Sequence, residues 1–372
     1  MKRFDVAVVG AGPAGLAAAI EAQKRGLNVL LVDMNLKAGG QLIKQIHKFF
    51  GSHEHRAGTR GIDIARDLYE EAVSSGVEVW LDAAVYAIYP GPVLEIARGI
   101  LATRTASKEM VHASRVVLAT GASENAVSFP GWTLPGVMGA GAAQTMINVE
   151  RVLPGKRVLM VGSGNVGLIV TYQLLQAGAE VVAIVEVAPK IGGYGVHSAK
   201  VRRAGVPILT SYTVLRAFGD RQVEGAEIVA YDEHHNPIEE TRQFLDVDTI
   251  CIAAGLKPYA KLAALAGCEL IYSPVLGGWM PVHDENMHTS VPGIYVAGDL
   301  AGVEEASTAL EEGRLAGLSA AESLGKGGPD AADEKESIRE RLSMLRIGPF
   351  GKARADAKSE VIKVGEKICR AG

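Results

Sequence analysis

Cysteine is scarce in this chain. Its 372 residues include three cysteines, Cys251, Cys268 and Cys369, which are 17 and 101 positions apart. This spacing provides neither a CxxC dithiol nor a local set of thiolate ligands for zinc or an iron–sulfur cluster, so electrons must travel without thiols. Cys251 lies in the apolar run 249–254 and is expected in the core, whereas Cys369 lies in a polar tail and is expected to be exposed.

The chain also lacks a Ser-His-Asp pattern, an HExxH motif and a long uninterrupted hydrophobic run. No apolar stretch reaches the ~18 residues of a transmembrane helix without a glycine-rich turn, so no membrane span is expected. Lys2 and Arg3 precede an apolar stretch, as in a signal peptide, but Asp5 interrupts it and we expect a cytoplasmic protein. The net charge of -4 argues against a nucleic-acid partner.

Glycine, in contrast, is abundant, with 44 residues beside 48% hydrophobic and 22% charged residues. This composition is typical of a soluble α/β protein rather than a disordered or fibrous one. The length exceeds that of a usual single core, which favours two domains and a tail.

Two of the glycine clusters are GxGxxG fingerprints that lie 152 positions apart. Each follows a β-rich apolar run, at 5–9 and at 157–161, and each precedes a helical pattern. In this motif the first glycine permits a tight strand-to-helix turn, the second lets the backbone approach a pyrophosphate, and the third lets the helix pack on the strand. The helix N-terminus then receives the negative charge. The predicted nucleotide contacts are Gly10, Gly12, Pro13, Ala14 and Gly15 in the first copy and Gly162, Gly164, Asn165, Val166 and Gly167 in the second.

An acidic residue ends the next strand after each fingerprint. Asp33 lies 23 positions after the first glycine of its motif, and Glu186 lies 24 positions after that of the second. Both intervals are close to the ~20 residues expected for an acid that binds ribose hydroxyls. Glu186 would repel a 2′-phosphate and therefore favours NAD(H) over NADP(H), although Lys190 weakens this preference. An ATP or ADP molecule in the second site remains an alternative.

Alternating strand and helix patterns predict parallel sheets. A second unit spans about 156–248, and a third segment returns at 249. Its last strand, 293–299, ends in Asp299, at the edge where ligands bind in open α/β sheets, and a helix is predicted at 304–323. Further predictions are strands at 5–9, 28–32, 77–80, 85–89, 115–119, 206–209 and 226–231 and an amphipathic helix at 61–75.

Residues 326–372 form a charged tail that begins with a Gly-Gly-Pro breaker. Ile338, Leu342 and Leu345 recur in it at helical spacing, which gives a narrow apolar stripe. The pattern fits equally a solvated, partly disordered extension and a partner-binding arm.

The two fingerprints, followed in order by Gly39-Gly40-Gln41, Ala119-Thr120-Gly121 and Gly298-Asp299, resemble flavoproteins with two dinucleotide-binding domains, the thioredoxin-reductase and glutathione-reductase superfamily. The resemblance implies an α/β fold with two Rossmann-like dinucleotide-binding domains, the second inserted in the first, plus the charged C-terminal tail. It implies an FAD-binding domain at 1–122 and 249–325, an NAD-binding domain at 123–248, and the tail at 326–372.

The same resemblance assigns further residues to FAD. It places Asp33, where the family more often has Glu, at the adenosine ribose, and the helix after Asp299 with its positive end toward the flavin. Gly40 and Gln41 would approach the flavin side, Thr120 and Gly121 would pass close to the FAD, Gly298 and Asp299 would bond the ribityl or pyrophosphate region, and Ser307 and Thr308 would lie at the start of that helix.

Disulfide reductases of this superfamily carry a redox cysteine pair after the first glycine unit or between Gly121 and the second fingerprint. Neither interval contains cysteine here, which excludes disulfide reduction. A more specific stretch, Pro130-Gly-Trp-Thr-Leu-Pro-Gly-Val137 followed by Gly141-Ala-Ala-Gln144, resembles the FAD/NAD subunit of heteromeric opine oxidases, hydrogen cyanide synthase, sarcosine oxidase (its α subunit) and dye-linked proline dehydrogenases. That resemblance implies a second flavoprotein subunit that oxidises a C–N bond, with either a small iron–sulfur subunit or direct electron exit from the flavin.

The sequence therefore predicts an FAD-dependent oxidoreductase that exchanges electrons with NAD(H), as the electron-transfer subunit of an amine or amino-acid dehydrogenase. The alternatives are a stand-alone NADH:acceptor reductase using a quinone, oxygen or a ferredoxin, and a scaffold subunit that holds an adenine nucleotide. His47-Lys-Phe-Phe-Gly51 also resembles anaerobe FAD-dependent oxidoreductases related to anaerobic glycerol-3-phosphate dehydrogenase, which keeps the substrate class open. His47, His53, His55, His234 and His235 are expected to be solvated loop residues, and no catalytic side chain or metal ligand is assigned because the flavin is the redox centre.

Overall fold

The computed structural model describes residues 1–348 and 351–369, with the side chain of Cys369 outside the described part. The chain divides into two compact units. Unit 1 contains residues 1–123 and the chain from 257 onward, and unit 2 contains residues 124–256, so unit 2 is inserted into unit 1. The connections between them carry β7 (Ala122–Glu124) and β16 (Leu256–Pro258), which pair in a two-stranded ribbon.

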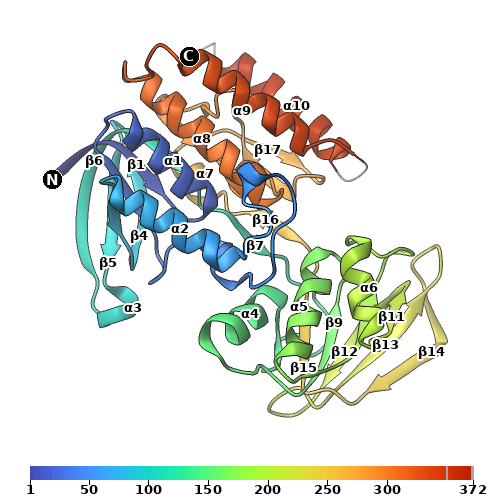
Figure 1. Cartoon of the computed structure of the whole chain (residues 1–372). Coiled ribbons are helices and arrows are strands. Elements are labelled where there is room, and N and C mark those ends of the chain that lie inside the picture. The colour runs from blue at the N-terminus through green and yellow to red at the C-terminus, as the bar shows by residue number, and fades with distance from the viewer. Residues whose placement is uncertain (349–350, 370–372) are drawn as a thin grey trace. The chain divides into compact units, whose positions relative to one another are not determined.

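Unit 1 is built on a seven-stranded sheet in the order β3-β2-β1-β6-β5-β4, with β19 also paired to β6 (Figure 1). β1, β2, β3, β6 and β19 run parallel, whereas β4, β5 and β6 form an antiparallel meander. β2 and the C-terminal halves of β1 and β6 are apolar runs, as expected for strands covered on both faces. The strands are β1 (Lys2–Val9), β2 (Val29–Val32), β3 (Glu78–Trp80), β4 (Ala83–Tyr89), β5 (Val93–Arg98), β6 (Ser107–Leu118) and β19 (Ile294–Val296).

Two helices of unit 1, α1 (Pro13–Lys24) and α8 (Ala306–Glu322), pack at close range through glycine. A Cβ at Gly313 would lie 2.1 Å from the carbonyl oxygen of Ala14, and one at Gly298 would lie 2.8 Å from the Ala14 Cβ. The loop after β19 and the body of α8 therefore both pack on the first turn of α1, which contains the last residues of the first fingerprint.

The rest of unit 1 consists of helices and one hairpin around this sheet (Figure 1). The helices are α2 (Gly61–Ser74), α3 (Ile100–Thr103), α7 (Lys261–Leu265), α9 (Ala331–Leu345) and α10 (Lys352–Cys369), and the hairpin strands are β17 (Leu270–Ser273) and β18 (Gly278–Pro281). Short 3₁₀ turns occupy Gly40–Lys44, His53–His55 and Gly298–Ala301.

The tail is helical and belongs to unit 1, so one of the two alternatives, the solvated, partly disordered extension, is wrong for its described residues. Ile338 and Leu342 of the apolar stripe are buried in the core of the unit, and Val361 of α10 packs with Leu276 and Met280. Charged side chains of α9 and α10 add ion pairs and hydrogen bonds to this apolar packing.

Unit 2 contains a five-stranded parallel sheet in the order β11-β10-β9-β15-β8 and a three-stranded antiparallel sheet in the order β12-β13-β14. The strands are β8 (Val137–Gly139), β9 (Arg157–Val161), β10 (Glu180–Glu186), β11 (Ile208–Thr210), β12 (Tyr212–Phe218), β13 (Gly225–Tyr231), β14 (Pro237–Leu245) and β15 (Thr249–Ile252). The helices are α4 (Ala140–Thr145), which continues into a π-turn at Met146–Glu150, α5 (Asn165–Gln176) and α6 (Gly195–Arg203).

The position of β15 differs from the sequence expectation. The run 249–252 was expected to open the returning part of the first domain, but it pairs with β9 and β8 inside unit 2. Apolar runs of this length do not specify which sheet they join, so the pattern could not place the return.

Candidate functional site

The first fingerprint is a tight turn in which two glycines are required by the fold, whereas the remaining one has room for a side chain. Gly10 has φ +106°, and a Cβ there would lie 2.2 Å from the carbonyl oxygen of Ala119. A Cβ at Gly15 would lie 1.7 Å from the carbonyl oxygen of Gly10, whereas the nearest atom to one at Gly12 is 3.9 Å away. The backbone at Gly12 is therefore accessible to a bound group.

Helix α1 begins directly at this accessible position. Gly12 is its N-cap and Pro13 its first residue, and no described side chain caps the helix there. The free N–H groups and the positive end of the helix dipole suit a pyrophosphate. Gly39 donates its N–H to the Ala11 carbonyl oxygen at 2.6 Å, which holds Gly40 against Gly12, and the exposed Gln41 follows.

Asp33 is buried beside the same turn. Its Oδ2 accepts the Ala11 N–H at 2.6 Å, and its Oδ1 accepts the N–H and the side-chain amide of Asn35 at 2.8 and 2.9 Å. Asp33 thus fixes the glycine loop. A carboxylate offers about four acceptor positions, so capacity remains for a ribose hydroxyl, which stays a prediction.

The other residues assigned to FAD lie at the C-terminal ends of β6 and β19. The Thr120 hydroxyl donates to the Tyr259 carbonyl oxygen at 3.0 Å, and a Cβ at Gly121 would meet nothing within 4 Å. The neighbouring strand β19 leads into Gly298 and Asp299. Parallel pairing of β6 with β1 and with β19 brings these segments to the edge of the sheet where the first fingerprint lies.

The start of α8 completes this edge. The helix begins at Ala306, and no described side chain caps it. The Thr308 hydroxyl donates to the Glu305 carbonyl oxygen at 2.6 Å, so it supports the helix start, and Ser307 is half-buried. The dipole of this 17-residue helix gives its N-terminus a partial positive charge.

Asp299 is the titratable group of this edge with the strongest perturbation. Burial raises the pKa of Asp299 to about 6; the Glu304 N–H, 3.3 Å from its Oδ1, opposes this, and the Glu312, Glu305 and Glu304 carboxylates add to it. The folded-state pKa lies above the unfolded value of 3.8, so between these two pKa values folding takes up a proton at Asp299. The contribution of Asp299 to the unfolding free energy is therefore lost as the pH rises through 6.

We expect the flavin-free protein to lose about 1.4 kcal/mol of unfolding free energy from Asp299 alone between pH 5 and pH 7. The Asp299→Asn variant lacks this titrating group, so its unfolding free energy should decrease between pH 5 and pH 7 by about 1.4 kcal/mol less than that of the wild type. Urea unfolding of both proteins at the two pH values measures the difference. Equal pH dependence in the two proteins would show that Asp299 does not titrate in this range.

The second fingerprint repeats the geometry of the first in unit 2. Gly162 has φ +106°, and a Cβ there would lie 2.3 Å from the Ala253 carbonyl oxygen; one at Gly167 would lie 2.2 Å from the Gly162 carbonyl oxygen. A Cβ at Gly164 would meet nothing within 4 Å. Gly164 is the N-cap of α5, whose first residues are Asn165 and the exposed Val166. The accessible backbone and the helix N-terminus therefore recur together.

Glu186 holds the second glycine loop as Asp33 holds the first. Its Oε2 accepts the N–H and the hydroxyl of Ser163 at 2.8 and 2.7 Å, and its Oε1 accepts the Ala188 N–H at 3.0 Å. The Glu186 carboxylate is therefore held beside the turn, and its effect on a 2′-phosphate stays a prediction.

Sequence reasoning missed a second glycine pair at this site. Gly193 donates its N–H to the Ser163 carbonyl oxygen at 2.9 Å, as Gly39 does to Ala11, and Gly192 lies against Gly164. The pattern was visible, because Glu186 precedes Gly192-Gly193 by the same interval that separates Asp33 from Gly39-Gly40. The Asn165 side chain ties this segment down by accepting the Tyr194 N–H at 2.8 Å.

His55 departs from the expectation of a solvated loop residue. It is buried, its Nε2 lies 3.1 Å from Glu311 Oε1 of α8, and its Nδ1 lies 2.8 Å from the Ser52 hydroxyl. Glu311 also pairs with Arg341 of α9. His55 therefore fastens the 45–60 segment to α8, a long-range contact that loop composition does not reveal.

The two described cysteines are both buried. Cys251 is completely buried in β15, and burial raises the pKa of its thiol to about 12. Burial also raises the pKa of Cys268, which lies in unit 1. Neither thiol forms a disulfide.

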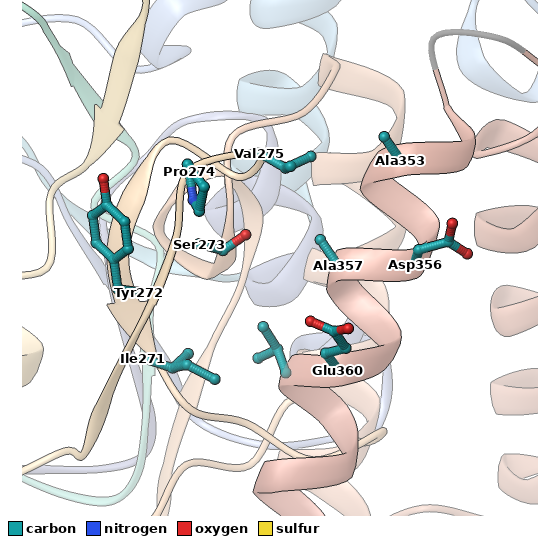
Figure 2. A pocket seen from close by; sticks show the side chains of 10 residues that line it. Ile271, Tyr272, Ser273, Pro274, Val275, Ala353, Asp356, Ala357 and Glu360 are labelled. Carbon is teal, nitrogen blue, oxygen red and sulfur yellow. The ribbon is translucent and has the colours of Figure 1, made fainter.

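A pocket of about 300 Å³ lies between the β17–β18 hairpin and α10 (Figure 2). Ile271 and Tyr272 line one wall, and Asp356 and Glu360 extend from α10 on the other. It contains no residue of either fingerprint. Within the described residues, no group of three His, Cys, Asp or Glu side chains is placed to hold a metal ion, and no helix has both the length and the apolar character needed to cross a bilayer.

Comparison with known proteins agrees with this geometry. A family described as pyridine nucleotide-disulphide oxidoreductase matches residues 4–313. An opine oxidase subunit of Agrobacterium tumefaciens is 31% identical, over 95% of this chain and 72% of that protein, and the alpha subunit of sarcosine oxidase from Rhizobium meliloti is 29% identical, over 96% and 35%. Thioredoxin reductase of T. acidophilum has the same fold, with a TM-score of 0.70 at 22% identity, over 87% of this chain and 100% of that one.

Proposed function

Since the chain belongs to the pyridine nucleotide-disulphide oxidoreductase family, we propose that it exchanges electrons between NAD(H) and FAD as the electron-transfer subunit of a heteromeric amine or amino-acid dehydrogenase of proline, sarcosine or opine type. Membership of the family makes the chain an FAD/NAD oxidoreductase. The role within a larger enzyme, the substrate class and the site residues are the proposal.

The observation that carries the proposal is the pair of matching glycine cradles. In each, the first and third glycines are closed in by backbone, while the second is open to an approaching group and begins a helix. FAD bound in unit 1 would supply a reversible hydride acceptor. Gly12 and the α1 N-terminus would hold its pyrophosphate, Asp299 would bond the ribityl or pyrophosphate region, and the start of α8 would face the flavin.

The second cradle is proposed to bind NAD(H). Glu186 keeps a negative charge beside the Ser163 N–H, at the position where a ribose would lie. A free 2′-hydroxyl can donate to that carboxylate, whereas a 2′-phosphate is repelled. ADP and ATP satisfy the same contacts, so this site alone does not distinguish electron transfer from nucleotide storage.

The subunit role is supported by the names of the relatives, which are subunits of an opine oxidase and a sarcosine oxidase. The proposed partner is a second flavoprotein subunit that oxidises the C–N bond, with electrons leaving through a small iron–sulfur subunit or directly from the flavin. Burial and raised pKa values argue against a redox role for Cys251 and Cys268, because the thiolate is the reactive form.

The direct test is anaerobic mixing of the flavin-loaded chain with NADH, followed by stopped-flow absorbance at the oxidised-flavin band near ~450 nm. We expect rapid bleaching, because the proposed route needs no partner for this half-reaction. The control is the same mixing with ADP, which occupies the second cradle without a hydride to donate. Retained FAD that NADH fails to bleach would contradict the route and favour the scaffold alternative.

A second experiment tests the subunit role. The isolated chain is expected to give no flavin bleaching with proline, sarcosine or an opine, and activity with one of them should appear after co-expression with a second flavoprotein subunit. Bleaching of the isolated chain by such an amine would contradict the subunit role. Sustained NADH oxidation by the isolated chain with a quinone or oxygen would favour a stand-alone reductase.

A further inference from the structure

The loop between β19 and α8, residues 298–305, is held by buried side chains from the C-terminal helices. This cofactor loop contains Gly298 and Asp299, which the proposed function assigns to FAD. Its backbone and one of its carboxylates are fixed by Glu312 of α8, Arg346 at the C-terminal end of α9 and Lys358 of α10.

Glu312 joins the loop to both cations. Its side chain is 2% exposed, and its Oε2 accepts the Gly298 N–H at 3.0 Å. Its Oε1 accepts from Lys358 Nζ and from Arg346 Nη2, each at 2.7 Å. One carboxylate therefore contacts the first residue of the loop with one oxygen and the tail with the other.

Lys358 is as deeply buried as its partner, at 2% exposure, although it lies on a helix with many exposed charged residues. Beside Glu312, its ammonium donates to the Ala301 carbonyl oxygen at 2.8 Å. A buried ammonium without acceptors is strongly unfavourable, so these two contacts specify where α10 docks.

Arg346 binds the C-terminal part of the loop. Its Nε and Nη2 donate to the Glu304 carboxylate at 3.0 and 2.6 Å, in the fork geometry that gives strong, directional pairs. Burial disfavours the guanidinium charge, but the Glu304 and Glu312 carboxylates raise the pKa of Arg346 overall. His283 adds no competing charge, because burial and the nearby Lys358 and Arg346 lower its pKa to about 3.

The three anchors therefore meet within seven residues of chain, at the Gly298 N–H, the Ala301 carbonyl and the Glu304 side chain. Buried ion pairs contribute little net stability compared with apolar packing, but they fix geometry. Residues that served only to attach a tail would have no need to converge on the backbone of one loop.

We propose that α9 and α10 form a positioning arm for the cofactor site, in which Lys358 and Arg346, acting with Glu312, hold the 298–305 loop in the conformation that binds FAD. This inference rests on the proposed function, because it takes Gly298 and Asp299 as FAD contacts. Lys358, Arg346 and Glu312 are positioning residues, which act on the cofactor through the loop.

The test uses the full chain with Lys358→Met, which keeps the length of the side chain and removes the charge and its donors. The matched control is Lys363→Met, an exposed lysine on the same helix. FAD affinity is measured by recovery of flavin fluorescence on dialysis, the flavin midpoint potential by dye equilibration, and amide hydrogen exchange of the 298–305 segment in the flavin-free protein. Circular dichroism confirms that each variant is folded.

For Lys358→Met we expect FAD affinity to fall by about tenfold or more, with a shifted midpoint potential and faster exchange at 298–305. Exchange in unit 2 should stay unchanged, and Lys363→Met should match the wild type in all three readouts. If Lys358→Met fails to fold, Lys358→Gln, which can still donate to Ala301, is measured instead and should show the same changes at smaller size.

The two proposals fail in different ways. A wild-type chain that takes up no FAD overturns the proposed function and this inference with it. A wild-type chain that binds FAD, together with a folded Lys358→Met protein of equal affinity, equal potential and equal exchange, overturns the positioning arm and leaves the proposed function standing.

Discussion

Replacing Gly15 with alanine is expected to destabilise unit 1 strongly, whereas the same replacement at Gly12 is expected to leave the stability of the unit nearly unchanged and to weaken FAD binding. The two glycines belong to one motif but face different surroundings. A Cβ at Gly15 would lie 1.7 Å from the Gly10 carbonyl oxygen, a distance that only a shift of α1 away from β1 can relieve. Overpacking of this kind costs on the order of 3 kcal/mol or more.

At Gly12 the nearest protein atom to an added Cβ is 3.9 Å away, so the methyl group fits the protein and projects into the space assigned to the pyrophosphate. We expect Gly12→Ala to unfold at nearly the wild-type temperature and to bind FAD about 100-fold more weakly, which corresponds to ~2.7 kcal/mol. Thermal unfolding of the flavin-free proteins and FAD titration measure the two effects separately.

Gly26→Ala is the control for the loss of a glycine, because it lies in the same βαβ segment and its Cβ would meet nothing within 4 Å. Its positive φ gives a small strain cost but should leave FAD affinity unchanged. If Gly12→Ala binds FAD as tightly as the wild type, the pyrophosphate does not lie over Gly12 and the assignment of the first cradle is wrong.

The contrast between these glycines shows what the sequence encodes locally. The spacing of Gly10, Gly12 and Gly15, and the interval to Asp33, follow from one strand, one turn and one helix, so they are readable without knowledge of the rest of the chain. The α/β fold class followed from the order of such local units, whereas the insertion of the second domain was implied by the family resemblance; both agree with the structure.

Contacts between distant segments were not readable in this way. The sequence predicted strands at 85–89 and 115–119 but missed β5 and the first half of β6. The buried Glu95 interrupts the apolar pattern of β5, and exposed polar residues interrupt that of β6. The charged tail was harder still. Lys358 and Arg346 have the sequence appearance of solvated residues, and only the carboxylates of α8 and its preceding loop, more than 30 positions away, make their burial favourable.

NADH, bound in unit 2, is expected to reduce the flavin about 100-fold faster than NADPH does at subsaturating nucleotide. Glu186→Gln is expected to lower this NADH:NADPH ratio by about tenfold. The carboxylate disfavours a 2′-phosphate by charge, and the amide removes the charge while keeping an oxygen that can accept the Ser163 N–H. The ratio should fall because NADPH binds more tightly once the repelling charge is removed, and because NADH binds more weakly once its ribose hydroxyl loses the carboxylate acceptor. Anaerobic flavin reduction over a range of concentrations of each nucleotide measures the ratio.

Glu180→Gln provides the matched control for this charge change. Glu180 lies on the same strand, is exposed and pairs with Arg157, with no contact to the glycine loop. If it alters the NADH:NADPH ratio as much as Glu186→Gln does, the preference arises from the general field of the unit rather than from contact with the ribose. Equal wild-type rates with the two nucleotides would contradict the role of Glu186 directly. Binding of ADP with no reduction by either nucleotide would identify the second cradle as an adenine-nucleotide site outside the electron path.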